Sequence, residues 1–149
     1  MSDSSPRLPV SQDAAIVLAL AETAIPFAGT REDEAERWVR LLRLHGQVGG
    51  VLQSLGVGEA PLETMARAPF PSHARRPGDD VVPKVGRVAA RFAAGRGAKL
   101  VGTVDVLFGV IETYGKTFDR ALYVRGATRE ELIERLALEA AAPAPGSKR

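Results

Sequence analysis

The stretch that decides the fold is LVGTVDVLFGVIETYGKTFDRALYVRGATREEL, which runs from Leu100 to Leu132. Gly102-Thr103 precedes an apolar run and predicts a helix start, with Asp105 in the first turn, where the helix dipole favours a negative charge. The apolar spacing predicts one buried face. The residues expected on it are Val106, Leu107, Phe108, Val110 and Ile111. Gly115 is expected to end this helix.

Two further helices follow within and beyond the same stretch. The first, over 116–125, is expected to bury Phe118, Ala121 and Leu122 and to end at Gly126. Thr128 and Glu131 then have the spacing of a capping box, in which each side chain satisfies an N–H group at a helix start. This predicts a last helix over 129–140, whose apolar positions are Leu132, Ile133, Leu136 and Ala137.

Residues 28–62 carry a weaker copy of the same order, and a helix precedes it. Ser11 is the expected N-cap of that helix, over 12–24, which is apolar around most of its surface and is therefore expected at the centre of the fold. Thr30 with Asp33 and Glu34 resembles a capping box for a helix over 31–44 that points Trp38 inward. A third helix over 47–55 ends at Gly56, and Pro61 opens a short fourth helix over 62–67.

The two copies predict one all-α domain, a pseudo-twofold duplicated bundle of about eight helices over 10–140. Repeat 1 covers about 10–67, a linker 68–82, and repeat 2 about 83–140, while 1–9 and 141–149 are expected to be a disordered lead and tail. Pro83 is expected to open repeat 2 with a helix that ends near Gly95 and buries Val85, Val88, Ala89 and Phe92. In the register of the repeat, Trp38 falls opposite Phe108.

The composition excludes several kinds of site. The chain has no cysteine and only two histidines, His45 and His73, so we expect no disulfide, no metal site and no cofactor. The formal net charge of +2 comes from charges of both signs spread along the chain, which argues against nucleic acid as a partner. No apolar run approaches the 18 residues of a membrane span, and the first nine residues lack the apolar core of a signal peptide. We expect a cytoplasmic protein that binds no membrane.

The sequence YGKT at 114–117 invites a nucleotide-binding interpretation. A P-loop needs four residues between its first glycine and the Gly-Lys pair, and it follows a buried strand. Here Gly109 and Gly115 have five residues between them, and those residues have a helical pattern. We therefore interpret Gly115 as a helix stop. No Ser, His or acidic constellation has catalytic spacing either, so we expect no enzyme activity.

The order of these motifs resembles the Clp amino-terminal repeat domain, which precedes the ATPase modules of the Clp unfoldases. The resemblance rests on LALAETA (18–24), AGT (28–30), VLQSLGV (51–57), LVGTVDVLFGVI (100–111) and ALYVRGATREEL (121–132), and it covers roughly residues 10–139. It implies a free-standing Clp-type bundle that binds proteins or peptides. The implied partners are an unfoldase, an adaptor or a substrate protein, in a proteolysis or stress system.

The resemblance also implies where a partner would bind. The expected partner-binding residues lie at the two Gly-Thr helix starts: Thr30, Glu32, Glu34, Thr103 and Asp105. The alternative interpretation of these acidic residues is that they only complement helix dipoles. The family commonly has Gly-Thr-Glu-His where this chain has Gly-Thr-Val-Asp at 102–105, so the acidic residue credited with phosphoarginine contact is absent there. Glu32 or Glu34 could stand in for it.

Two functions stay open from the sequence. The first is a non-enzymatic binding module that works as an adaptor, decoy or recruitment domain. The second is a sequestering protein that holds a small molecule or an antibiotic peptide in the groove between its repeats.

Overall fold

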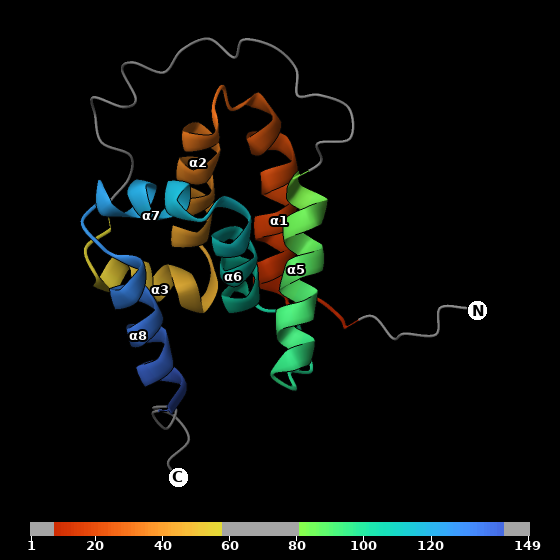
Figure 1. The fold of residues 1–149 in the computed structure, drawn as a ribbon. Helices are drawn as coiled ribbons and strands as arrows, with labels where there is room; N and C mark the ends of the chain where they lie inside the picture. Colours follow the sequence, from red (N-terminus) through yellow and green to blue (C-terminus); the bar gives the residue numbers. More distant parts are fainter. Residues whose placement is uncertain (1–7, 58–80, 142–149) are drawn as a thin grey trace.

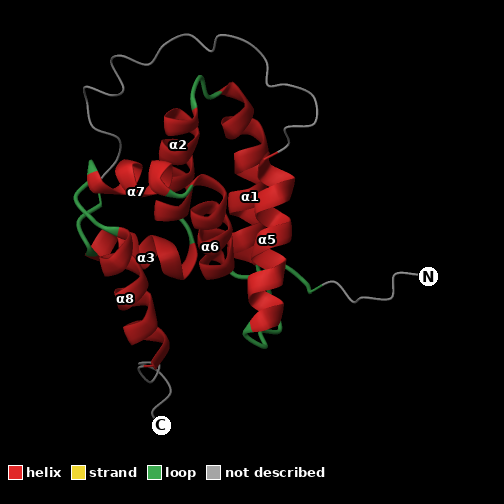
Figure 2. Cartoon of the chain, viewed as in Figure 1, coloured by secondary structure: helices red, strands yellow, loops and turns green. Residues whose placement is uncertain are grey.

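A computed structural model describes residues 8–57 and 81–141, and within these ranges the chain forms helices and no strand (Figure 2). The elements are α1 (Gln12–Ala24), a 3-10 helix η1 (Ile25–Phe27), α2 (Arg31–Arg43), α3 (Gly46–Ser54), α5 (Val81–Gly95), α6 (Thr103–Tyr114), α7 (Lys116–Tyr123) and α8 (Arg129–Ala141). The predicted all-α class is confirmed. The expected helix over 62–67, residues 68–80 of the expected linker, and residues 1–7 and 142–149 lie outside the described residues.

Three helix starts were predicted correctly in atomic detail. The hydroxyl of Ser11 accepts a hydrogen bond of 3.1 Å from the amide of Ala14 at the start of α1. The hydroxyl of Thr30 accepts one of 3.0 Å from the amide of Asp33 at the start of α2. Thr128 and Glu131 satisfy each other's amides at 3.1 and 3.0 Å. The first amides of a helix have no carbonyl acceptor within the helix, and short polar side chains at these positions supply one.

Several boundaries differ from the prediction. Helix α5 begins at Val81, two residues before the expected opening at Pro83. Proline is tolerated there because the first helical turn needs no N–H donor. The lead expected over 1–9 ends earlier, since Leu8 lies against the core and the amide of Val101 donates a 2.9 Å hydrogen bond to the carbonyl of Pro9. The start of α1 is thus tied to the loop before α6.

The helices form one bundle around α6, as Figure 1 shows. Helix α1 lies beside α5, α2 contacts α6 and α7, and α3 contacts α6 and α8 (Figure 1). Helices α5 and α6 approach very closely at Gly109, where a Cβ atom would lie 2.7 Å from the carbonyl oxygen of Val85. Because Gly109 has no side chain, α5 and α6 can pack this closely.

The core is continuous through both halves of the chain. Its largest fully buried side chains include Trp38, Leu42 and Leu52 from the first half and Leu107, Phe118, Leu122 and Leu132 from the second. The indole N–H of Trp38 donates a 3.1 Å hydrogen bond to the hydroxyl of Tyr114 and so joins α2 to α6. Burial of Trp38, Phe118 and Leu122 is as the sequence predicted.

Several packing predictions were wrong, among them the burial of Phe92, which is 37% exposed on α5. Helix α1 is not central: only its stripe of Ala14, Val17 and Ala21 is buried, and Leu20 is exposed. Ala137 is exposed on α8. Phe108 is only partly buried, although the register of the repeat placed it opposite the buried Trp38. An apolar pattern identifies residues that can be buried, but tertiary packing decides which of them are.

The ends of α3 and α7 have matching geometry. Gly56 and Gly126 follow these helices with φ of 88° and 103°. The next residue in each case, Val57 or Ala127, is buried and donates its amide to the carbonyl five residues earlier, at 3.0 and 3.3 Å. This is the Schellman arrangement, in which glycine adopts a left-handed conformation and releases the chain from the helix.

Among the described helices, none combines the length and the hydrophobicity that a membrane crossing requires.

Candidate functional site: an aromatic groove between α5 and α6

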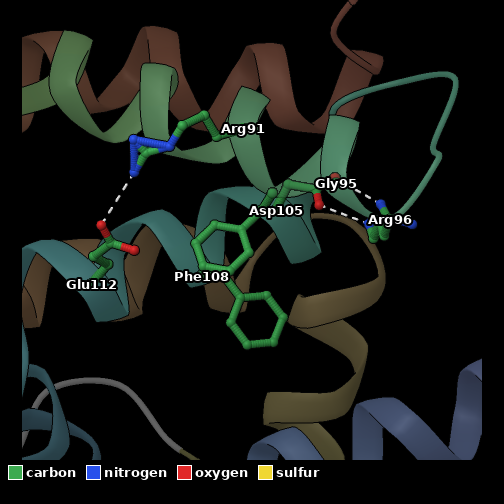
Figure 3. A pocket seen from close by; sticks show the side chains of 7 residues that line it. Arg91, Gly95, Arg96, Asp105, Phe108 and Glu112 are labelled. Atoms are coloured by element: carbon green, nitrogen blue, oxygen red, sulfur yellow. Dashed lines mark hydrogen bonds and ion pairs between the residues drawn. The ribbon is translucent and has the colours of Figure 1, made fainter.

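The surface between α5 and α6 holds an open groove with a volume of about 490 Å³. Its lining comes from Arg91, Phe92, Gly95, Arg96, Asp105, Phe108 and Glu112 (Figure 3). The groove lies inside the second half of the chain, whereas the sequence placed a ligand groove between the two repeats. A volume of this size falls within the range of small-ligand sites.

The middle of the groove is a stacked pair of phenylalanines. The rings of Phe92 and Phe108 have centroids 5.3 Å apart and planes inclined by 27°. Phe92 is 37% exposed, and Phe108 is partly buried. Because Gly109 lets α5 and α6 approach closely, the two rings meet across the helix interface instead of entering the core. The groove thus presents an apolar aromatic surface to solvent.

One end of the groove is fixed by a strong ion pair between Arg96 and Asp105. The guanidinium of Arg96 donates hydrogen bonds of 2.8 and 2.7 Å to the two carboxylate oxygens of Asp105. Asp105 is fully buried, and it also accepts a 2.9 Å bond from the amide of Gly102, which caps α6. The hydrogen bonds to the carboxylate raise the pKa of Arg96 further above its usual value. This paired, bidentate arrangement holds Arg96 in a defined position at the rim.

The other end of the groove is a loose ion pair between Arg91 and Glu112. Their closest N–O distance is 3.2 Å, and the side chains are 67% and 51% exposed. An ion pair this exposed contributes little to stability, because water and salt screen it. Figure 3 shows Phe108 between the two ion pairs, with Arg91 and Glu112 at one end and Arg96 and Asp105 at the other. A ligand could replace Glu112 at small cost.

Thr103, one of the predicted partner-binding residues, is buried and occupied inside the protein. Its hydroxyl accepts a hydrogen bond of 3.5 Å from the amide of Val48 at the start of α3, and a Cβ atom at Gly46 would lie 2.7 Å from that hydroxyl. The hydroxyl of Thr103 therefore serves as an acceptor for an amide at the start of α3, while Gly102 and Asp105 cap α6. Thr103 is 4% exposed and Asp105 is fully buried, so neither side chain lies at the surface.

The other predicted residues gather at the start of α2. Thr30 and Glu32 are exposed, and Glu32 lies 3.9 Å from Arg120 of α7. Glu34 accepts a 2.7 Å hydrogen bond from the hydroxyl of Tyr114. The acidic start of α2 is thus separate from the start of α6, so the five predicted residues form no single surface.

The contacts of Tyr114 join α2 and α6. The guanidinium of Arg31 lies 4.9 Å from the centroid of its ring and donates a 2.9 Å bond to the carbonyl of Thr113. Burial, and then the hydrogen bond to Glu34, raise the pKa of Tyr114 well above its usual value. Glu34 thus makes a hydrogen bond within the fold, a role different from the helix-dipole complementarity given as the alternative above.

Arg91, Phe92, Arg96 and Glu112 are not among the partner-binding residues that the sequence predicts. Phe92 has helical spacing with Val85, so the pattern assigned it to the core. One signal was available: residues 81–104 contain five cations, Lys84, Arg87, Arg91, Arg96 and Lys99, and no Asp or Glu. A helix with one strongly basic face indicates an interaction surface.

Two other motifs have plain structural roles. Gly115 ends α6 with φ of 56° and joins it to α7, as predicted, so the YGKT sequence is a helix junction. Within residues 8–57 and 81–141, no three side chains of His, Cys, Asp or Glu come together where they could hold a metal ion.

A comparison with models of known protein families finds no match for this chain, and a comparison with curated proteins finds none either.

Proposed function

We propose that this chain is a non-enzymatic, cytoplasmic protein- or peptide-binding module, and that the groove between α5 and α6 holds its partner. The observation that carries the proposal is the stacked pair of the exposed Phe92 and the partly buried Phe108 in a groove of about 490 Å³. An apolar surface patch that is rimmed by polar residues is typical of binding sites. The ion pairs at both ends supply the polar rim that such sites have.

The resemblance to the Clp amino-terminal domain supports the same class of function. In that family the domain receives adaptors and substrates, so we propose that this chain acts as an adaptor, decoy or recruitment domain in a proteolysis or stress system. We also propose that its two halves descend from one four-helix unit. The glycine ends after α3 and α7, at Gly56 and Gly126, agree with the duplication, and α5 ends in the same way at Gly97.

A selection of random peptides on the immobilised protein tests the proposal. We expect enriched peptides that bind wild type at least tenfold more tightly than the Phe92→Ser variant. The matched control is Leu20→Ser, which replaces a similarly exposed apolar residue on α1 and is expected to bind as wild type does. Circular dichroism checks that each variant keeps its helices. Peptides that bind Phe92→Ser and wild type equally would contradict the proposed site.

The second candidate function is sequestration of a small molecule or antibiotic peptide. The specific observation in its favour is the groove volume, which suits one small ligand. A pulldown with and without a competing peptide separates the two. A protein partner that the competitor displaces supports the module, whereas tight binding of a compact ligand with no protein partner supports sequestration.

A further inference from the structure

We infer that the α5–α6 groove selects acidic peptides that carry one large apolar side chain. This inference rests on the proposed function and adds the chemical class of the partner. Its starting point is the charge of α5 and the loop after it: five cations lie between residues 81 and 104, with no carboxylate among them. A peptide on this surface meets Phe92 and Phe108 at the centre and positive charge beside them.

The basic side chains lie together on the exposed side of α5. Lys84, Arg87 and Arg91 are spaced at i, i+3 and i+7, which places them on one face of a helix, and all three are exposed. Neither Lys84 nor Arg87 has an ion pair with another residue of the described ranges. Arg91 belongs both to this face and to the lining of the groove. The basic face of α5 is therefore continuous with the aromatic pair.

Only two carboxylates line the groove, and only Glu112 neutralises a cation at its surface. Asp105 is fully buried and both its oxygens are occupied by Arg96. The guanidinium of Arg96, half exposed, still has N–H groups that make no bond to Asp105. Glu112 is the one exposed competitor, and it holds Arg91 through a single 3.2 Å hydrogen bond.

The arrangement favours a carboxylate-bearing ligand over a neutral one. An acidic side chain beside the anchor can take the place of Glu112 at Arg91, and further acidic residues can pair with Arg87 and Lys84. Each such ion pair is exposed to solvent, so each adds modestly to affinity. Their combined contribution decreases as the salt concentration rises. Selection therefore comes from the apolar anchor together with several weak charge pairs.

Fluorescence anisotropy with defined probes tests the inference. The probes are a labelled peptide with one phenylalanine flanked by glutamates, the same peptide with glutamines, the same with lysines, and a labelled single-stranded oligothymidine. We expect the glutamate peptide to bind wild type about tenfold more tightly than the glutamine peptide, and the lysine peptide to bind more weakly still. Phe92→Ser should weaken all three peptides.

Two charge variants sharpen the test, because they should move affinity in opposite directions. Arg91→Gln should weaken the glutamate peptide about threefold, and Glu112→Gln should strengthen it about threefold, because it removes the competing carboxylate. Lys116→Gln on α7 removes an exposed cation outside the groove and should change nothing. The glutamine peptide should be insensitive to all three substitutions.

The possible failures are distinct. If the glutamine and glutamate peptides bind equally and both need Phe92, the groove binds peptides but the acidic class is wrong. If no peptide distinguishes wild type from Phe92→Ser, the proposed function fails as well. Tighter, Phe92-dependent binding of the oligothymidine would overturn the inference in favour of nucleic acid.

Discussion

The hydroxyl of Tyr114 donates a 2.7 Å hydrogen bond to the carboxylate of Glu34, eighty residues earlier in the chain. The same hydroxyl accepts the indole N–H of Trp38 at 3.1 Å. The hydroxyl of Tyr114 thus joins α6 to α2 at two points. Glu34, which the sequence predicts to bind a partner, makes one of these contacts inside the protein.

Replacing Tyr114 by phenylalanine should lower the free energy of unfolding by about 1–3 kcal/mol, because the buried indole N–H of Trp38 loses its acceptor. Urea denaturation followed by circular dichroism measures the loss. Tyr123→Phe is the control, since Tyr123 is exposed on α7 and its replacement should stay within about 0.5 kcal/mol of wild type. Equal effects of the two substitutions would show that the Tyr114 hydroxyl does not stabilise the fold.

The raised pKa of Tyr114 also predicts how stability depends on alkaline pH. The folded pKa lies above the usual value of about 10.0, because burial and Glu34 disfavour the phenolate. The unfolded chain therefore releases this proton first, so the contribution is constant below about pH 10 and is lost as pH rises further. Tyr114→Phe should reduce the pH dependence of unfolding in that range.

The chain has only two tyrosines, so the Tyr123→Phe variant isolates Tyr114 spectroscopically. In this variant, tyrosinate absorbance should appear only as helical circular dichroism disappears. Absorbance that rises while the helices remain intact would contradict a raised pKa for Tyr114.

Glu36→Gln should destabilise the protein by about 3 kcal/mol, because it removes the carboxylate beside a buried arginine. Arg125 and Glu36 lie 3.8 Å apart, with side chains 1% and 16% exposed. Burial lowers the pKa of Arg125, which reflects the cost of keeping its charge in the core. Adding Arg125→Met to the Glu36→Gln variant should recover most of the loss in chemical denaturation.

The matched control for this pair is Glu32→Gln. Glu32 lies 3.9 Å from Arg120, a nearly equal separation, but both side chains are more than half exposed. Its replacement should change stability by no more than about 0.5 kcal/mol. If Glu32→Gln costs as much as Glu36→Gln, burial is not what sets the strength of these pairs.

Two glycines on facing helices should respond to alanine with opposite signs. At Gly109 the new Cβ atom would lie 2.7 Å from the backbone of α5, so we expect a loss of about 1–3 kcal/mol as the helices separate. At Gly86 on α5 nothing lies within 4 Å, so alanine should stabilise by about 0.5–1 kcal/mol through its better helix propensity. Thermal unfolding of both variants checks this, and a stabilising Gly109→Ala would disprove the close approach of α5 and α6.

The sequence predicted the helices well because their signals are local. Ser11, Thr30 and Thr128 cap the helices that they were expected to cap, and Gly56, Gly115 and Gly126 end the preceding ones. These features depend on a few neighbouring residues whose hydrogen-bonding needs are the same in any fold. Burial of Trp38 and Phe118 also followed from apolar spacing.

The site could not be predicted in the same way, because it depends on contacts between distant segments. Thr103 looked like a cap for its own helix, yet its hydroxyl bonds to Val48, fifty-five residues earlier. Phe92 and Phe108 each fit a core pattern, and only the packing of α5 on α6 leaves Phe92 exposed and Phe108 partly buried. The basic composition of residues 81–104 was the one sequence signal that indicated this face.

The most direct test of the central claim is backbone amide NMR of the full chain during titration with a selected peptide. We expect the largest chemical-shift changes at Arg91, Phe92, Phe108 and Glu112, and we expect them to be lost in Phe92→Ser. Changes centred on Thr30 to Glu34, with the α5–α6 groove unaffected, would contradict this claim.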